Sequence, residues 1–413
     1  MSRETIVLGA GMVGVSIALH LARRGRSVVL VDRKAPGRET SFGNAGIIQR
    51  EAVQPHCFPR DAGSLLRMLP NRRVDIRYRP ASVLAAANPL WQHWRYSEPR
   101  RYARIVPEYA SLIMRCTAEH EALIEAAGAE SLVKKEGWIE AFRSPSVFDE
   151  QLKNAADAQK RFGVDYQTLD QASLKAHEPY LSEALLGAIH WTNAWTVVDP
   201  GALVAAYAQA FAGLGGHIEE TDARGIAPTA NGWRVTTRGG SLEARELVVA
   251  LGPWSGAWLR QLDYRLPLFP MRGYHMHYAA SADAKLNHWL LDFDVGYLLA
   301  PMRAGIRLTT GAEIASIDSP PRTSQLDAAE AAARKLFPLG ERLDASPWKG
   351  ARPCMPDMKP VIGPAPKHKG LWFAFGHGHQ GFTLGPVTGR LLGEMMDNEP
   401  PAVDMSPFRA DRF

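Results

Sequence analysis

Apolar and polar positions near the N-terminus follow the pattern of a strand, a helix and a second strand. The segment TIVLG is a β-branched apolar run, typical of a strand buried on both faces. Residues 12–24 have helical periodicity, with Ser16 and His20 on the face that we expect to be polar. The segment SVVLVD is a second buried strand that ends at Asp32. The pattern therefore predicts a βαβ unit over residues 4–33.

The turn between the first strand and the helix reads GAGMVG, with glycine at positions 9, 11 and 14. Gly9 permits a tight turn, Gly11 lets a pyrophosphate approach the backbone, and Gly14 lets helix and strand pack closely. The N–H groups and dipole at the helix N-terminus favour a phosphate. Asp32 is placed to accept a hydrogen bond from a ribose hydroxyl, which argues against the 2′-phosphate of NADP. The motif predicts a dinucleotide site and leaves FAD and NAD as alternatives.

Two segments after this unit allow more than one interpretation. The loop TSFGNAGIIQ, residues 40–49, is either a surface turn or a loop that lies against the cofactor. Residues 62–127 are predicted to be mostly helical, punctuated by prolines. Within them we expect Trp91, Trp94 and Tyr96 to pack in a core or between domains.

The later part of the chain combines a set of antiparallel strands with a final strand and helix. The strands are PMRGYHMHYA, VGYLLAPMRAG and IRLTTGAEI, followed by a helix over residues 324–336. The buried strand LWFAFG and the closing helix are expected to join the opening unit in one parallel sheet. We predict two interleaved domains with the ligand at their junction. The cofactor domain comprises residues 1–57, 165–260 and 340–413, and the substrate domain comprises residues 58–164 and 261–339 with a helical insertion.

Composition and charge exclude several classes of function. The chain has 413 residues, 22% charged, and a formal net charge of +5, without a long Lys/Arg run or zinc-finger spacing, so nucleic-acid binding is not expected. The three cysteines are scattered and form no CxxC, which fits a reducing compartment. His377 and His379 lie close together without a third ligand, so no metal site is expected.

The order of the motifs resembles that of FAD-dependent amine and amino-acid oxidoreductases. The glycine motif, SFGNAG, VDP, VVALGPWS, GARPCMPDMKPVIG and GHGHQGFTLGP follow one another as in D-amino-acid oxidase, glycine oxidase and sarcosine oxidase. The nearest resemblance is to bacterial D-amino-acid dehydrogenases, including D-hydroxyproline dehydrogenase relatives. It implies an α/β fold in which a glutathione-reductase-like, Rossmann-type FAD-binding domain is interleaved with an antiparallel-sheet substrate domain.

The resemblance implies an enzyme that oxidatively deaminates a D-amino acid, with D-proline and hydroxy-D-proline among the candidates. A hydride passes from the substrate Cα to flavin N5 and leaves an imino acid. Alternatives are an oxidase of glycine, sarcosine or other N-substituted amino acids, and a noncatalytic flavin-binding subunit. The electron acceptor is a quinone, oxygen or a soluble carrier, and the location is cytoplasmic or at the inner face of the membrane. FAD is expected to be noncovalent, because the linking cysteine of sarcosine oxidases matches near Gly350 and not Cys354.

The resemblance also implies which residues contact FAD. They come from the glycine motif, the second strand end, the loop after it, two later strand ends and the C-terminal turn. These residues are Gly9, Ala10, Gly11, Met12, Val13, Gly14, Asp32, Arg33, Ser41, Asn44, Ala45, Gly46, Ile47, Ala223, Gly252, Gly378, Gly381, Phe382 and Thr383.

Four further residues are candidates for contact with the substrate. Arg352 in GARP matches the arginine that pairs with the substrate carboxylate, a role suited to a rigid guanidinium fork. The alternative is a structural arginine bonded to backbone carbonyls. Tyr274 and Tyr297 lie on strands of the substrate domain and are either carboxylate ligands or core residues. His379 is a candidate to face the flavin or the substrate, whereas His377 resembles a structural residue of the turn.

Overall fold

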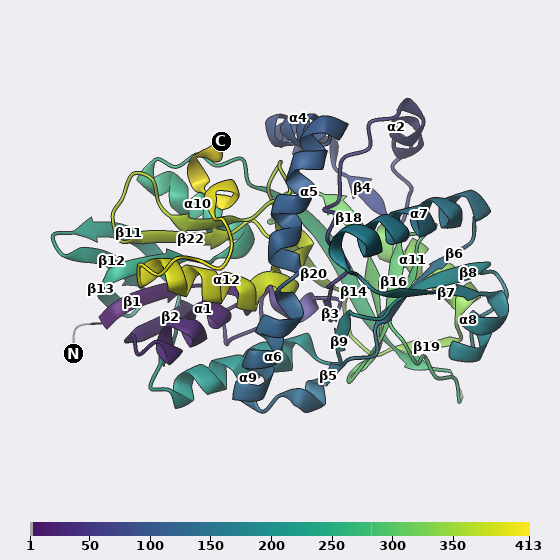
Figure 1. Cartoon of the computed structure of the whole chain (residues 1–413), viewed down its shortest axis with the longest axis horizontal. Coiled ribbons are helices and arrows are strands. Elements are labelled where there is room, and N and C mark those ends of the chain that lie inside the picture. Colours follow the sequence, from purple (N-terminus) through teal and green to yellow (C-terminus); the bar gives the residue numbers. More distant parts are fainter. Residues whose placement is uncertain (1–2, 282) are drawn as a thin grey trace.

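The strands of the protein are arranged in separate sheets. The computed structural model describes residues 3–281 and 283–413, and within them the strands form two large sheets and a small one. Figure 1 shows the large sheets at opposite ends of the long axis, with the helices α5, α6 and α12 between and beside them. The small sheet contains β3 (Ile47–Ile48), β9 (Trp195–Val197) and β5 (Val133–Lys134).

The first large sheet contains the predicted βαβ unit. Its strand order is β10-β2-β1-β13-β12-β11, and β22, which also pairs with β21, joins the carboxyl end of β13 in parallel. The strands are β1 (Arg3–Leu8), β2 (Val28–Asp32), β10 (His217–Glu220), β11 (Ala223–Thr229), β12 (Gly232–Thr237), β13 (Gly240–Val249), β21 (Val361–Pro364) and β22 (Leu371–Phe375). The expected union of the opening unit with the final strand is confirmed.

Helix packing against this sheet corrects one prediction. The helices on it are α1 (Met12–Arg23), α9 (Pro200–Gly213), α10 (Ser255–Leu259) and α12 (Gly381–Met396). The pattern places Ser16 and His20 on a polar face of the helix, but both are buried. Helix α12 covers them so closely that a Cβ on Gly389 would lie 2.6 Å from the carbonyl oxygen of Ser16. The predicted polar face of α1 is therefore a helix–helix contact.

The second large sheet is mostly antiparallel and is built around one long strand, β14. Its order is β4-β18-β14-β17-β16-β15-β6-β8-β7, with β19 and β20 also paired to β14. The strands are β4 (Ile76–Tyr78), β6 (Trp138–Phe142), β7 (Tyr166–Asp170), β8 (Gly187–Trp191), β14 (Phe269–Ala280), β15 (Leu290–Asp292), β16 (Tyr297–Met302), β17 (Gly305–Thr310), β18 (Ala312–Ile314), β19 (Leu339–Arg342) and β20 (Trp348–Cys354). Its flanking helices are α7 (Pro145–Phe162), α8 (Gln171–His177) and α11 (Ser324–Leu336).

Strand pairing moves the predicted domain boundaries. Residues 165–191 were assigned to the cofactor domain, but β7 and β8 pair with β6 in the second sheet. Residues 340–354 also belong to the second sheet, because β20 pairs with β14. The segment of β20 is rich in proline and glycine, so its sequence did not indicate a strand. It is held as a strand by backbone hydrogen bonds to β14.

The predicted helical segment is confirmed, but the packing expected of its two tryptophans is wrong. Its helices are α2 (Ala62–Met68), α3 (Pro80–Ala85), α4 (Ala87–Tyr96), α5 (Pro99–Ile113) and α6 (Cys116–Ala127). Trp91 and Trp94 are 54% and 37% exposed, so neither lies in a core. Figure 1 shows α2 and α4 at one edge of the molecule. No helix of the described residues combines the length and the apolar character that a membrane span requires.

Candidate active site

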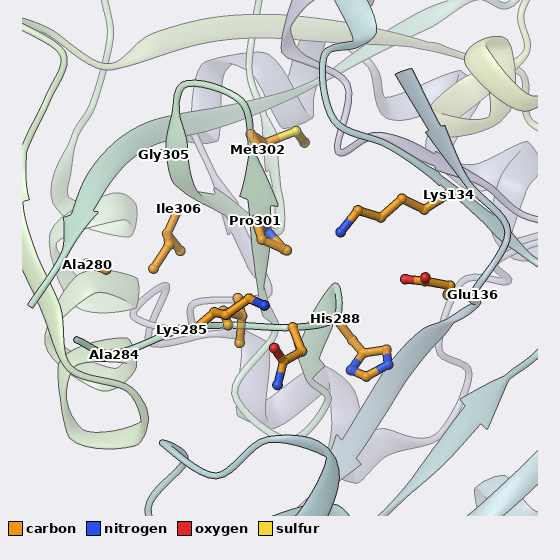
Figure 2. A pocket seen from close by; sticks show the side chains of 12 residues that line it. Lys134, Glu136, Ala280, Ala284, Lys285, His288, Pro301, Met302, Gly305 and Ile306 are labelled. Carbon is orange, nitrogen blue, oxygen red and sulfur yellow. The ribbon is translucent and has the colours of Figure 1, made fainter. Parts of the chain in front are cut away.

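Residues of both large sheets line one cavity of about 1130 Å³. It extends from Gly9, Asp32 and Gly252 on the first sheet to Arg352 and Trp138 on the second. A smaller pocket of about 500 Å³ is lined by residues that include Lys134, Lys285 and His288, and Figure 2 shows their side chains around it. None of the predicted site residues lines that smaller pocket, so the larger cavity is the candidate active site.

The glycine motif has the geometry that its three roles require. Gly9 has φ +105°, and a Cβ there would lie 2.4 Å from the carbonyl oxygen of Ala250. A Cβ on Gly14 would lie 1.7 Å from the oxygen of Gly9, so this position packs helix against strand. A Cβ on Gly11 would meet only Ser41 Oγ among the described atoms within 4 Å, at 3.2 Å. Gly11 therefore leaves its backbone open to the cavity.

Asp32 closes the same end of the cavity. The Ala10 N–H donates to Asp32 Oδ2 at 2.6 Å, and the Lys34 N–H donates to Oδ1 at 3.2 Å. Burial raises the pKa of this carboxyl. Two oxygens together offer about four lone-pair positions, so Asp32 can still accept from a ligand hydroxyl. Nearby, the Arg33 guanidinium lies 4.6 Å from the ring centre of Trp254, and Ala223 also borders the cavity.

The loop of residues 40–47 lines the cavity, which favours the cofactor-loop interpretation over a surface turn. Ser41, Asn44, Ala45 and Ile47 belong to the cavity wall. The Met12 N–H donates to Ser41 Oγ at 2.9 Å, which joins this loop to the start of α1. Two residues on the side of the second sheet donate hydrogen bonds to this loop, and the sequence did not indicate either of them. Arg307 Nη1 donates to the Asn44 oxygen at 2.6 Å, and Trp289 Nε1 donates to the Ala45 oxygen at 2.9 Å.

Gly46 and Thr383 support this loop from behind and do not line the cavity. Gly46 has φ +71°, and a Cβ there would lie 2.4 Å from the Val197 oxygen. Thr383 Oγ1 accepts from the Gln49 N–H at 3.3 Å. Their packing and hydrogen bonds position the loop, and their cofactor contacts stay a prediction.

The C-terminal turn presents a helix N-terminus to the cavity. Gly378, Gly381 and Phe382 line the wall, and within the described chain no side chain caps the start of α12. A Cβ on Gly378 would meet no described atom within 4 Å. The N–H groups and dipole of this helix can therefore stabilise negative charge on a bound ring.

Two buried histidines anchor the turn. His377 Nε2 lies 2.9 Å from Oγ1 of Thr388, a residue within α12. This contact agrees with the structural role expected for His377. His120, which the sequence did not indicate, lies 3.0 Å from both the Phe382 oxygen and the Tyr207 hydroxyl. Burial lowers the pKa of His120 to about 4, so the neutral ring donates to the Phe382 carbonyl and accepts from Tyr207.

Arg352 lies in the cavity wall without an acidic partner. Its Nη1 donates long hydrogen bonds to the oxygens of Gly311, at 3.3 Å, and Arg272, at 3.5 Å. No carboxylate of the described residues forms a salt bridge with it. Burial lowers its pKa. Backbone carbonyls thus orient the guanidinium, and its charge is left for a ligand.

Two further histidines lie beside Arg352. The rings of His379 and His56 are 4.7 Å apart between centres, and both line the cavity. Burial, the other ring and Arg352 all lower the pKa of His379 well below its usual value. The pKa of His56 is lowered by burial and by Arg352. Both rings are therefore neutral near pH 7, and the sequence indicated only His379.

The two candidate tyrosines lie on the opposite face of the second sheet. Both border the cavity, but their side chains belong to the buried cluster that includes Leu326 and Ala329 of α11. The Tyr274 hydroxyl donates to Glu313 Oε2 at 2.6 Å, beside Arg272. Tyr297 is the register partner of Asp292 on β15. The strand pleat directs both side chains to the face opposite Arg352. The Tyr274 hydroxyl is engaged by Glu313, whereas no described atom hydrogen-bonds to the buried Tyr297 hydroxyl, so the substrate contacts of both tyrosines stay predictions.

The comparison with protein families decides the identity. A family model described as DAO, FAD dependent oxidoreductase, matches residues 4–395. The chain belongs to this family. D-amino-acid oxidase of Bradyrhizobium diazoefficiens is 28% identical over 422 residues, which cover 100% of this chain and 99% of that protein. D-amino acid dehydrogenase of Cereibacter sphaeroides is 29% identical over 424 residues, which cover 99% and 95%.

Solved structures confirm the fold of this DAO-family enzyme. Glycine oxidase from Geobacillus kaustophilus matches with a TM-score of 0.76 at 23% identity over 100% of both chains. L-proline dehydrogenase from P. horikoshii matches with a TM-score of 0.75 at 18% identity, over 100% of this chain and 98% of that one. These likenesses show the FAD-binding α/β fold with its second, mostly antiparallel sheet, as the resemblance implied.

FAD is the cofactor of this flavoenzyme, and the cavity fits it. Open glycine positions at Gly11 and Gly378 and the uncapped start of α12 lie along the cavity wall. Asp32 at one end suits a ribose, and the start of α12 at the other suits a ring that gains negative charge on reduction. The match to an FAD-dependent family sets aside the alternative of a nicotinamide cofactor.

Proposed function

We propose that this flavoenzyme oxidises the Cα–N bond of a D-amino acid to an imino acid, which water hydrolyses to a 2-oxo acid. The observation that carries the proposal is Arg352, a half-buried guanidinium in the cofactor cavity without a carboxylate partner among the described residues. An amino-acid carboxylate supplies the missing charge and matches the guanidinium fork. The names of the relatives, D-amino-acid oxidase and D-amino acid dehydrogenase, support the same substrate class.

The residues around Arg352 suit this reaction. When bound, FAD supplies the two-electron acceptor for the hydride that leaves Cα. Arg352 holds the carboxylate and thereby fixes the position of Cα, which is an orientation effect. The amine must lose its extra proton so that the nitrogen lone pair assists hydride departure. The neutral rings of His56 and His379 are bases within the same cavity wall, and a ring nitrogen of either can accept that proton.

We also propose that FAD is held without a covalent bond. Cys354 lines the cavity, but burial raises the pKa of its thiol to about 12. A thiol with that pKa is rarely a thiolate, which is the form that attacks. Acid precipitation of the protein should release all yellow colour into the supernatant. Colour retained in the pellet would contradict this part of the proposal.

For the electron acceptor we propose a quinone in an anionic bilayer. Residues 58–104 contain ten arginines, no lysine and three acidic residues, so this segment carries more positive charge than the whole chain's net +5. Leu66, Leu69, Leu84 and Trp91 on or next to α2–α4 are 54–79% exposed. Exposed apolar side chains among arginines are complementary to an anionic lipid surface. Arg67 and Met68 of α2 also line the cavity, so this face borders the site.

Vesicle sedimentation tests the acceptor proposal. The holoenzyme should sediment with vesicles that contain anionic phosphatidylglycerol, and it should remain in solution with neutral phosphatidylcholine vesicles. Replacing Leu84 and Trp91 with serine should reduce sedimentation, whereas replacing the exposed Leu214, at the end of α9, should not. Equal binding to neutral vesicles, or none to either, would contradict it.

Anaerobic bleaching of the flavin tests the reaction itself. A panel of D- and L-amino acids, glycine, sarcosine and D-proline is mixed with holoenzyme without oxygen, and absorbance near ~450 nm is followed. Bleaching by D- but not L-amino acids supports the proposal. Bleaching by glycine or sarcosine alone would favour an N-substituted or glycine substrate. Bleaching by no amino acid would favour a noncatalytic flavin-binding subunit.

A further inference from the structure

Two carboxylates outside the predicted site share one part of the cavity wall. Glu51 follows the cofactor loop, and Glu140 lies on β6 of the second sheet. Glu51 is only 8% exposed. Within the described chain neither carboxylate forms a salt bridge, although buried carboxylates are usually paired.

Half of the hydrogen-bonding capacity of Glu51 is unused. Oε1 accepts from Trp138 Nε1 at 2.9 Å and from Gln49 Nε2 at 3.0 Å. Oε2 is buried, and no described atom donates to it. A buried acceptor without a donor is uncommon in folded proteins. The geometry therefore points to a donor that binds in the cavity.

Aromatic side chains flank the two carboxylates. Trp138 on β6 and Trp191 on β8 are register partners, and both line the cavity. Phe293 and Tyr109 line the same cavity. Carboxylates combined with aromatic faces are the side chains that bind ammonium and guanidinium groups.

We propose that Glu51, Glu140, Trp138 and Trp191 form a subsite for the positively charged side-chain end of a basic D-amino acid. The proposal rests on the proposed function, since Arg352 holds the carboxylate end of the substrate in the same cavity. The subsite selects a cation by charge, whereas a cavity of apolar walls alone would accept neutral side chains equally well.

The protonation of the pair gives the subsite a measurable property. Burial raises the pKa of Glu51 to about 8, with a contribution from Glu140, and burial raises that of Glu140 to about 7. Arg50 and the buried Cys116 thiol are further titratable groups beside Glu51. A bound cation favours the ionised carboxylates, so its binding should release protons near pH 7.

Matched substrates separate charge from shape. D-Arginine and D-citrulline have nearly the same shape, but only D-arginine carries a side-chain charge. We expect kcat/KM for flavin reduction to favour D-arginine by roughly tenfold or more. D-Ornithine and D-lysine, compared with D-norleucine, test how far the side chain must reach.

Variants then assign the preference to these residues. Glu51→Gln and Glu140→Gln should each lower the ratio of kcat/KM for D-arginine to that for D-citrulline. Glu136→Gln, an exposed carboxylate on the chain just before β6, is the matched control and should leave the ratio unchanged. The flavin spectrum and thermal unfolding confirm that each variant is folded.

A nonreacting ligand provides the second readout. The compound 5-guanidinopentanoate has the carboxylate and the guanidinium but no α-amine. Titration calorimetry in two buffers of different ionisation enthalpy should show proton release with the wild type and less with Glu51→Gln.

The outcomes distinguish the subsite from the proposed function. If neutral D-amino acids bleach the flavin but D-citrulline equals D-arginine, the subsite is overturned and the function stands. If Glu51→Gln slows both substrates equally, Glu51 serves proton movement or folding, and the subsite is also overturned. If no amino acid bleaches the flavin, the proposed function itself fails.

Discussion

The guanidinium of Arg352 lies directly against Gly273 on the neighbouring strand. A Cβ atom on Gly273 would lie 2.9 Å from Arg352 Nη2 and 3.3 Å from Cζ. The two strands, β14 and β20, pair Met271 with Arg352 and Gly273 with Gly350. The glycine therefore leaves the space that the arginine side chain occupies over the sheet.

This contact predicts that Gly273→Ala disturbs substrate binding but not FAD binding. The added methyl group must displace the guanidinium by a few tenths of an ångström or more, which misplaces the bound carboxylate. We expect kcat/KM for amino acids to fall about tenfold, mostly through KM. Gly256→Ala is the control, because a Cβ there meets only ordinary contacts, with Leu268 Cδ2 nearest at 3.5 Å. Unchanged kinetics in Gly273→Ala would show that the arginine moves without cost.

Replacement of Arg352 itself should remove most of the activity. Arg352→Lys keeps the charge but loses the fork, and Arg352→Met keeps much of the volume without the charge. From the fall in kcat/KM we expect a loss of transition-state stabilisation of about 2 kcal/mol for Arg352→Lys and about 4 kcal/mol for Arg352→Met. Stopped-flow reduction gives the rate, and the flavin absorbance spectrum reports whether the cofactor site is intact. If Arg352→Met retains wild-type kinetics, the carboxylate is bound elsewhere.

His379→Ala should slow flavin reduction. The ring lies beside His56 and Arg352 and is neutral near pH 7, because its pKa is lowered well below the usual value. We expect a fall of about tenfold to a hundredfold in the reduction rate if the ring accepts the substrate proton. His56→Ala measures the contribution of the neighbouring ring. Reduction kinetics equal to wild type in both variants would assign the pair a structural role.

Glu51→Gln should change how stability depends on pH. The pKa of Glu51 is raised from 4.5 to about 8 in the folded chain, so the fold favours the protonated carboxyl. That stability is fully present below pH 4.5 and is lost as the pH rises through 8. Glutamine mimics the protonated form at every pH, so the variant should gain roughly 3 kcal/mol over wild type between pH 5 and pH 8.5. Urea unfolding at both pH values measures this, and a difference that does not vary with pH would contradict it.

Gly378→Ala should weaken FAD binding. Gly378 has φ +59°, and Gly163 at the end of α7 has φ +62°; a Cβ on either meets no described atom within 4 Å. Alanine should therefore cost about 1 kcal/mol of backbone strain at both positions. Only Gly378 borders the cavity, so only its methyl group should also hinder the cofactor. Fluorescence titration of apoprotein with FAD should give a raised Kd for Gly378→Ala and an unchanged Kd for Gly163→Ala.

Much of the cofactor site could be predicted because its residues are close together in sequence. The βαβ unit, the three glycines and Asp32 form one continuous segment, and their roles depend on local backbone geometry. The final helix and its turn were predicted for the same reason. The polar face of α1 was not, because α12 comes from more than 350 residues later in the chain and covers it.

The substrate side of the site depended on contacts that local patterns do not contain. Tyr297 and Leu298 are neighbours in sequence, yet only a one-residue difference in register decides which of them faces the cavity. The sequence pattern of β16 is apolar on both faces, so it could not indicate which face α11 would cover. Likewise, nothing local brings His56 to His379, or Glu51 to Glu140, because each pair joins distant segments.

The sequence by itself determined the FAD-binding unit, the order of the elements and the position of Arg352. Only the tertiary structure decided which side chains surround that arginine, where the domain boundaries fall and which carboxylates enter the cavity. The physical reason is that strand pairing and helix packing choose between the two faces of every strand. Which face becomes buried depends on segments far away in the chain, so the local pattern of apolar and polar residues does not indicate it.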